Sequence, residues 1–586
     1  MTENREDWQV IAEHKRADRA NRLAPYADWS LGDLTPPPSR KHVASLVHAR
    51  LTDKERSFVA SDVTDLVQRL ATQKCTAVEV TTAFCKATYA AQELTNCLTE
   101  VMFAEALVCA NELDKHLSET GQVVGPLHGI PVSVKDHICV KGADTACGYV
   151  DWAFKNIAKE DALLVQILRA AGAIIYVKTT NPQGLLALET SSNLYKSTAN
   201  PHGRTTNPFN RDLAAGGSSG GEAVLIGTGA NLLGVGTDLG GSIRSVDIHL
   251  LVVCLLMCFV RVPAAWCGVY ALKPSVHRIP LPSSGVFMPY KGKEDLTLVA
   301  GPMTRSVRDL ELFCRVVSEY QVWYPDPNTL SIPWNGKIAE GSPSEKLVIG
   351  LCIDDGVVAP HPPIIECLKK AREVLVAAGH EVIDWTPIDS GGAAELLLRF
   401  YVLDGGKDIR GPLEASGEPA VELIQLLLDK GKELGECTLA ESWALNVKRD
   451  QLRARALGHW NSTTSQSKCG RPMDVVLCPT AATLAPPHDT TRWVGYGAYW
   501  NLLDLPAAVF PSGKPFNAEE WKSGTHPPVG NPRNPIEKFV ADQWHPDTYD
   551  GAPVGLQLVG RRWQDEKLIA HLKIVDALLN PPDARI

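Results

Sequence analysis

The residues that could do chemistry gather in three short stretches where glycines surround polar side chains: 125–137, 214–223 and 236–244. They supply one lysine, Lys135, and several serines, among them Ser242. A serine hydroxyl becomes a nucleophile when a neighbouring base takes its proton, and a lysine that has lost its own proton can be that base. The three stretches therefore indicate nucleophilic attack by a serine.

Lys135 follows the run IPVSV at 130–134, whose β-like pattern would carry the lysine into the interior. Burying an ammonium group is costly, and the group responds by losing its proton, so burial would lower its pKa. Taken alone, the simpler interpretation is a lysine at a strand end with its ammonium group in solvent or paired with Asp136.

The stretch AAGGSSGGEA at 214–223 could bring main-chain amides close to a bound group, because glycine permits backbone conformations denied to other residues. It lacks the Gly-Lys-Ser/Thr ending of a P-loop, which disfavours phosphate binding. It does match Gly-x-Ser-x-Gly with Ser219 at its centre, the nucleophile elbow of α/β-hydrolases, although so short a pattern occurs easily by chance. A flexible Gly/Ser loop is the alternative.

The stretch GTDLGGSIR could form an oxyanion hole. Its successive amides could converge on one point, with Ser242 placed to attack the carbon that bears the oxygen. These amides belong to Leu239, Gly240, Gly241 and Ser242. Taken alone, a glycine turn before a helix, capped by Ser242, explains the stretch equally well.

Together the three stretches resemble the hallmark of the amidase signature family: Gly-x-Pro-x-x-x-Lys-Asp, Gly-Gly-Ser-Ser-Gly-Gly and Gly-Thr-Asp-x-Gly-Gly-Ser-Ile-Arg. Here they stand in that order at 129–136, 216–221 and 236–244. The resemblance extends from about residue 60 to the end of the chain. Segments such as YDGAPVGLQLVGRR at 549–562 are similar to fungal acetamidase-type amidases and to fatty acid amide hydrolase.

The resemblance implies a catalytic triad in which Ser242 is acylated, Ser218 is a bridging serine on a cis peptide bond, and Lys135 is the base. It implies hydrolysis of small or aliphatic carboxylic amides to acid and ammonia through an acyl-enzyme, with no cofactor and no metal. Ser218 also joins the predicted substrate-binding residues. For Lys135 to act near neutral pH, its pKa must lie well below its ordinary value.

Three further residues are candidates for supporting roles. Asp238 and Arg244 flank the nucleophile turn with opposite charges, so we expect an ion pair that fixes its shape; two unrelated surface charges are equally compatible. Leu185, in NPQGLLALE, matches a position that lines the substrate pocket in fatty acid amide hydrolase. An ordinary core leucine of a helix is the alternative.

The sequence departs from the family pattern directly after the predicted nucleophile. In family members Ser-Ile-Arg runs straight into a Val/Ile/Phe-Pro-Ala/Ser segment, which here begins only at Val262, so 245–261 look inserted. The apolar run within them, 248–260, has about 13 residues and is shorter than the roughly 20 needed to cross a bilayer. This insertion leaves an inactive amidase-like protein as one alternative function. The Gly-x-Ser-x-Gly match leaves a second alternative, an α/β-hydrolase esterase that uses Ser219.

Short apolar runs alternate with amphipathic stretches along the chain, which is typical of an α/β protein. The strand-like runs are 173–178, 346–352 and 474–479, and the helical stretches are 162–172 and 363–379. We expect one large amidase-signature domain over 61–586, with a mixed central β-sheet covered by helices on both faces. Residues 1–60 are expected to form an N-terminal helical arm.

Composition restricts the partners and the location. The net charge of −9, with lysine and arginine scattered, argues against nucleic acid. The 15 cysteines are dispersed and lack metal-ligand spacing, which is typical of reduced thiols, and the N-terminal segment lacks the apolar core of a secretory signal. We expect a cytoplasmic enzyme with a small-molecule amide substrate and no membrane span. Its oligomeric state stays open, with a homodimer as one option.

Overall fold

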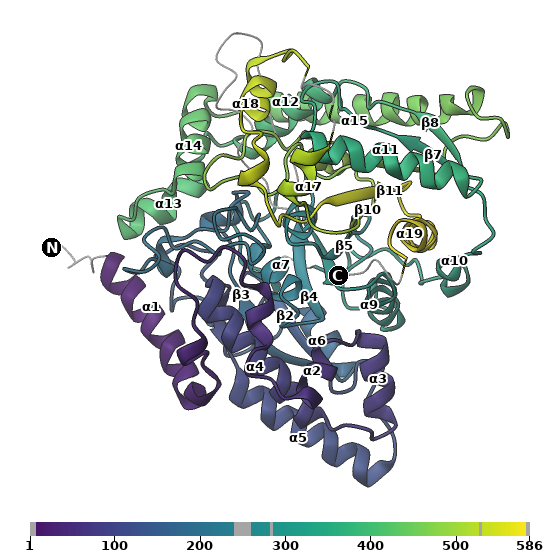
Figure 1. The fold of residues 1–586 in the computed structure, drawn as a ribbon. Helices are drawn as coiled ribbons and strands as arrows, with labels where there is room; N and C mark the ends of the chain where they lie inside the picture. Colours follow the sequence, from purple (N-terminus) through teal and green to yellow (C-terminus); the bar gives the residue numbers. More distant parts are fainter. Residues whose placement is uncertain (1–7, 240–259, 282–284, 525, 527–529, 582–586) are drawn as a thin grey trace.

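Within the described residues, eleven strands form one sheet that runs through the molecule (Figure 1). The computed structural model describes residues 8–239, 260–281, 285–524, 526 and 530–581. The strands are β1 (Leu98–Val101), β2 (Pro131–Lys135), β3 (Ile174–Thr179), β4 (Leu233–Asp238), β5 (Tyr270–Lys273), β6 (Val299–Thr304), β7 (Val348–Leu351), β8 (Glu381–Asp384), β9 (Val475–Pro479), β10 (Ala507–Pro511) and β11 (Gly555–Val559).

Helices surround the sheet, and along the chain they occur between its strands (Figure 1). They are α1 (Trp8–Leu23), α2 (Asp53–Val59), α3 (Val63–Ala71), α4 (Ala77–Thr95), α5 (Phe103–Thr120), α6 (Leu163–Ala170), α7 (Gly220–Gly227), α8 (Arg261–Trp266), α9 (Val307–Glu319), α10 (Gly336–Glu340), α11 (Pro362–Ala377), α12 (Ser390–Tyr401), α13 (Lys407–Ser416), α14 (Glu422–Leu434), α15 (Leu439–Ser462), α16 (Gly495–Leu502), α17 (Ala518–Ser523), α18 (Pro535–Asp542) and α19 (Asp565–Leu579). None of the described helices is long and apolar enough to cross a membrane.

The strands follow the order β1-β3-β2-β4-β6-β5-β10-β11-β9-β7-β8. β2 pairs in parallel with β3 and β4, and β7 pairs in parallel with β8 and β9, whereas the other pairs are antiparallel. The sheet is therefore mixed, as the sequence predicts. Because β2 and β4 are parallel neighbours, their carboxyl ends meet at the same edge of the sheet, where α/β proteins commonly place their sites.

The predicted elements agree with the structure to within a few residues. The three strand-like runs contain most of β3 and all of β7 and β9, and the two helical stretches contain α6 and most of α11. Every residue of β2, β3, β4 and β6 is buried, which requires cover on both faces of the sheet. The cover includes α7 against β2 and β4, α9 against β5 and β6, α8 against β5, β10 and β11, and α19 against β10 and β11.

The first described helix, α1, is attached to the rest of the molecule by a buried cation. Lys15 is 2 % exposed, and its Nζ lies 2.5 Å from a carboxylate oxygen of Glu100 and 2.8 Å from one of Asp144. Both carboxylates are buried as well. A charge network of this kind ties an amino-terminal helix to β1 and to the loop after β2.

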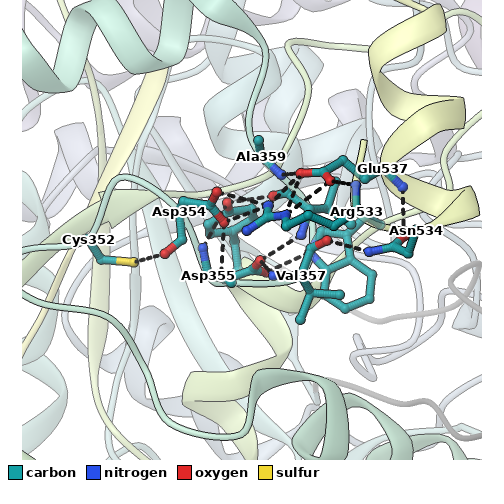
Figure 2. Close-up of polar contacts among 12 residues, drawn as sticks. Cys352, Asp354, Asp355, Val357, Ala359, Arg533, Asn534 and Glu537 are labelled. Atoms are coloured by element: carbon teal, nitrogen blue, oxygen red, sulfur yellow. Dashed lines mark hydrogen bonds and ion pairs between the residues drawn. The ribbon is translucent and has the colours of Figure 1, made fainter. Parts of the chain in front are cut away.

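An acidic cluster fixes the loop that follows β7 (Figure 2). Asp355 accepts two backbone N–H groups of its own loop at 2.9 Å each, and burial raises its pKa to about 7. Arg533, just before α18, pairs with Asp354 at 2.9 Å and with Glu537 at 2.5 Å. These contacts hold the chain just before α18 against the loop that follows β7.

Candidate active site

The carboxyl ends of β2 and β4 bring Lys135 and Thr237 together. Lys135 is fully buried, and its Nζ donates to Ser218 Oγ at 2.5 Å and to Thr237 Oγ1 at 3.1 Å. The interpretation of Lys135 as a lysine with its ammonium group in solvent is therefore wrong. The structure brings together two of the three predicted triad residues, which lie 83 positions apart in the sequence.

Ser218 lies in the loop that leads into α7, and this loop is packed tightly. The Gly217–Ser218 peptide bond is cis, as the resemblance implies. Gly216 has a φ of +85°, and a Cβ at this position would lie only 2.6 Å from Pro263 Cα, in α8. A glycine is therefore needed at position 216 for close approach between the serine loop and α8.

A histidine that the sequence analysis did not consider is part of the same network. His137 Nε2 lies 2.8 Å from Thr237 Oγ1, the oxygen that also accepts from Lys135. His137 is fully buried, and burial, followed by the charges of Lys135 and Lys178, holds its pKa well below the ordinary value. A neutral His137 can fix the Thr237 hydroxyl. The sequence feature that could have indicated His137 is its position two residues after Lys135, on the loop that follows β2.

Glu222, at the start of α7, is a second buried group that the sequence analysis missed. Its carboxyl oxygens accept Ser133 Oγ at 2.5 Å and Thr179 Oγ1 at 2.8 Å, and burial raises its pKa to about 7. Ser133 is two residues before Lys135 on β2, so the two side chains leave the strand on the same face. Glu222 thus links α7 to β3 and to β2, the strand that carries Lys135.

The hydroxyl of Ser219, the alternative nucleophile, is engaged with the backbone of β4. Its Oγ donates to the Thr237 carbonyl oxygen at 3.4 Å and accepts the Thr237 N–H at 3.3 Å. Ser219 is fully buried. This arrangement gives Ser219 a structural role as the residue that joins α7 to β4.

The third glycine-rich stretch is described only as far as Leu239. Gly240, Gly241, Ser242 and Arg244 lie outside the described residues, so their predicted roles stay predictions. Leu239 borders a cavity of about 480 Å³. The apolar residues lining this cavity include Ile279, Leu281, Val286, Met288, Leu296 and Leu298, and its charged residues include Lys291, Lys293, Glu294 and Asp326.

Leu185 lies in a 3₁₀ turn (Gln183–Leu185) after β3 rather than in an α-helix. It is 3 % exposed, and its φ of +66° is unusual for a bulky side chain. Strained backbone of this kind clusters at functional sites. Among the described residues, Leu185 is not part of the lining of the cavity beside Leu239, and its predicted role in the pocket stays a prediction.

Asp238, at the end of β4, pairs with an arginine 23 positions further along the chain. Arg261 Nε lies 3.1 Å from Asp238 Oδ2, and neither side chain has any exposed surface. Asn501 Nδ2 donates to Asp238 Oδ1 at 2.6 Å. The expected ion pair with Arg244 is not tested, because Arg244 lies outside the described residues.

The described residues contain no group of three or more His, Cys, Asp or Glu side chains placed to hold a metal ion, and their cysteines are free thiols. The chemistry that these residues offer is that of a buried lysine hydrogen-bonded to a serine.

Comparison with known proteins identifies the family of the chain. The sequence pattern of the family described as Amidase matches residues 79–245 and 260–569. The chain is 34 % identical to an acetamidase of Emericella nidulans, with 98 % of each chain covered. It is 37 % identical to amidase 1 of Gibberella moniliformis, with 89 % of this chain and 94 % of that protein covered.

A solved structure of fatty acid amide hydrolase superposes with a TM-score of 0.83 at 31 % identity, over 98 % of this chain and 95 % of that one. The fold and the relatives define a class of protein, the α/β enzymes that hydrolyse amides. The chain belongs to the amidase signature family. The family match is interrupted between 245 and 260, where the sequence analysis predicts an insertion.

Proposed function

We propose that this amidase hydrolyses small or aliphatic carboxylic amides to a carboxylic acid and ammonia, with Ser242 as nucleophile, Ser218 as bridging serine and Lys135 as base. The observation that carries the proposal is the 2.5 Å contact between Lys135 Nζ and Ser218 Oγ, fully buried at the carboxyl ends of β2 and β4. Thr237 holds the lysine from a second side.

In the proposed reaction, the Ser242 hydroxyl gives its proton to Ser218 Oγ as the Ser218 proton passes to Lys135 Nζ. Ser242 Oγ attacks the amide carbon, and the backbone amides of 239–242 stabilise the oxyanion. The C–N bond breaks as the nitrogen takes a proton back through Ser218, and ammonia leaves. Water then attacks the acyl-enzyme by the same relay, which releases the acid and restores Ser242.

Two observations support the choice of substrate. The cavity beside Leu239 is lined by apolar residues, which suit an aliphatic acyl group, together with charged and polar residues. The relatives named acetamidase suggest that a small primary amide is accepted.

We also infer a cytoplasmic location from the dispersed cysteines. The oligomeric state stays open, with a homodimer as one option, and size-exclusion chromatography with light scattering would measure it.

Hydrolysis of acetamide, a long-chain primary amide and an aryl amide by the purified full-length chain tests the proposal. Release of ammonia from acetamide or the long-chain amide, lost in Ser242→Ala and retained in Ser219→Ala, is the expected result. A folded chain that hydrolyses none of the three amides would instead favour the inactive amidase-like protein. Hydrolysis lost in Ser219→Ala and retained in Ser242→Ala would favour the esterase alternative.

A further inference from the structure

Two arginines bracket the interruption in the family pattern, and the sequence alone does not say which one belongs to the family frame. Arg244 follows Ser-Ile, and Arg261 precedes Val-Pro-Ala. Removing 244–260 or removing 245–261 leaves the same sequence, Ser-Ile-Arg-Val-Pro-Ala. Only the contacts of the two side chains can distinguish the alternatives.

Arg261 occupies a site built to hold a guanidinium. Its Nε donates to Asp238 Oδ2 at 3.1 Å, and its Nη1 donates to Gln557 Oε1 at 3.0 Å. Its Nη2 donates to the Gly497 carbonyl oxygen at 2.9 Å and also bonds to Asn501 Oδ1. A lysine side chain has a single nitrogen and could not donate to all of these acceptors, which match the forked shape of a guanidinium.

The side chains that accept hydrogen bonds from Arg261 are themselves held by further hydrogen bonds. Gln557 donates through Nε2 to the carbonyl oxygens of Pro479 and Tyr496 at 2.7 Å each, so its Oε1 is directed at Arg261. Asn501 donates to Asp238 while accepting from Arg261. β4, β11 and α16 therefore each supply an acceptor to the same guanidinium.

The donors to Asp238 that the structure describes leave little of this carboxylate for a second guanidinium. Among the described residues, Asp238 accepts from Arg261, from Asn501 and from the backbone N–H of Val260, which fill three of the roughly four acceptor sites of a carboxylate. A second guanidinium here would leave positive charge buried without compensation, which is strongly unfavourable.

The chain neighbours of Arg261 pack against both segments that carry the predicted catalytic serines. It begins α8, and Pro263 of the same helix packs on Gly216, two residues before Ser218. On the other side, a Cβ at Gly236 would lie 2.9 Å from Val260 Cγ2, so the residue before Arg261 packs on β4. Asp238 directly precedes Leu239, the first amide of the predicted oxyanion hole.

We propose that Arg261, and not Arg244, is the positioning residue that anchors the nucleophile turn through Asp238, and that the segment added to the family frame is 244–260. The role of Arg261 in catalysis rests on the proposed function, whereas its pairing with Asp238 does not. The family frame then runs from Ile243 directly to Arg261.

A thermal double-mutant cycle tests the pairing in any folded protein, active or not. The variants are Asp238→Asn, Arg261→Gln and Arg244→Gln, with the two double variants that contain Asp238→Asn. Residues in one buried ion pair do not act additively, so we expect Asp238→Asn to lower the melting temperature much less in the Arg261→Gln background than in the full chain. In the Arg244→Gln background its effect should be unchanged. Non-additivity with Arg244 and additivity with Arg261 would overturn the proposal.

Arg261→Lys covers the case in which Arg261→Gln does not fold, because it keeps the charge and loses the fork of donors. The rate of labelling by a fluorophosphonate, measured below the melting temperature, then tests the positioning role. We expect Arg261→Lys to slow labelling by about a hundredfold and Arg244→Lys to change it by less than about threefold. Slow labelling in Arg244→Lys with normal labelling in Arg261→Lys would contradict the proposal.

The same labelling comparison in the variant that lacks 244–260 separates this proposal from the proposed function. In this variant Arg244 is absent and only Arg261 of the two arginines remains. Its replacement by lysine should slow labelling by the same factor as Arg261→Lys does in the full chain. A full chain that is folded but unlabelled counts against the proposed function, while the thermal cycle still decides which arginine pairs with Asp238.

Discussion

A buried lysine can serve as a base only if its surroundings leave it a free electron pair near neutral pH. Lys135 is enclosed at the carboxyl end of β2, with the hydroxyls of Ser218 and Thr237 as neighbours. Hydroxyls can donate to a neutral amine as well as accept from an ammonium group, so they suit a lysine that gains and loses a proton. His137 is held neutral by burial and adds no charge to compete with the lysine.

Lys135→Ala should lower kcat/KM for the amide substrate by about 10²–10⁴-fold, since positioned proton transfer contributes that much. Ser218→Ala should have a loss of similar size, and the double variant should lose little more, because the two residues act as one unit. Steady-state kinetics below the melting temperature provide the measurement. Lys74→Ala, at an exposed position, is the control and should leave the rate unchanged. Full activity in Lys135→Ala would refute the role of the lysine.

Glu222 should make stability depend on pH. Its pKa is raised from 4.5 to about 7 by burial, so the folded protein keeps a proton that the unfolded chain releases. The stabilisation from this group is complete below about pH 4.5 and is lost as pH rises towards 7. Urea unfolding should show a lower free energy of unfolding at pH 8 than at pH 5. In Glu222→Gln this difference between the two pH values should be smaller by up to about 3 kcal/mol. The same fall in both proteins would contradict the assignment.

The elements show what the sequence could and could not predict. IPVSV and AIIYVK are apolar and β-branched over a strand's length, so β2 and β3 could be predicted locally. The pairing of β5 with β10, more than 230 residues later, could not, because no local pattern encodes which distant strands share a register. For the same reason the Lys135–Ser218 contact came from a motif, while Arg261, His137 and Glu222 emerged only from the packing of α7, α8 and β4.

Gly216→Ala should disrupt the contact between the serine loop and α8. The added Cβ would lie 2.6 Å from Pro263 Cα, and the φ of +85° is unfavourable for alanine, so neither loop nor helix can keep its position. We expect a lower melting temperature and a rate of fluorophosphonate labelling that falls by about tenfold or more. Gly458→Ala in α15 is the matched control, with nothing within 4 Å of the added Cβ. It should be neutral or stabilising by about 0.5–1 kcal/mol. Normal labelling in Gly216→Ala would show that this packing does not position Ser218.

At the scale of the whole molecule, we propose that residues 1–60 act as an arm that is needed for stability rather than for chemistry. Lys15→Met should leave the buried carboxylates of Glu100 and Asp144 without their cation, at a cost of about 3–5 kcal/mol in the free energy of unfolding. Lys41→Met removes an exposed pair with Asp212 and should cost less than about 1 kcal/mol. Calorimetry compares the two; equal melting temperatures would show that the arm contributes little.

We propose that this chain keeps a working Lys135–Ser218–Ser242 relay despite the segment that the sequence predicts to be inserted after the nucleophile turn. The most direct test is to label the full-length folded chain with a fluorophosphonate and to identify the modified peptide by mass spectrometry. We expect a label on Ser242 that is abolished in Ser242→Ala and strongly reduced in Lys135→Ala and Ser218→Ala. A folded chain that takes up no label, or a label on Ser219, would contradict it.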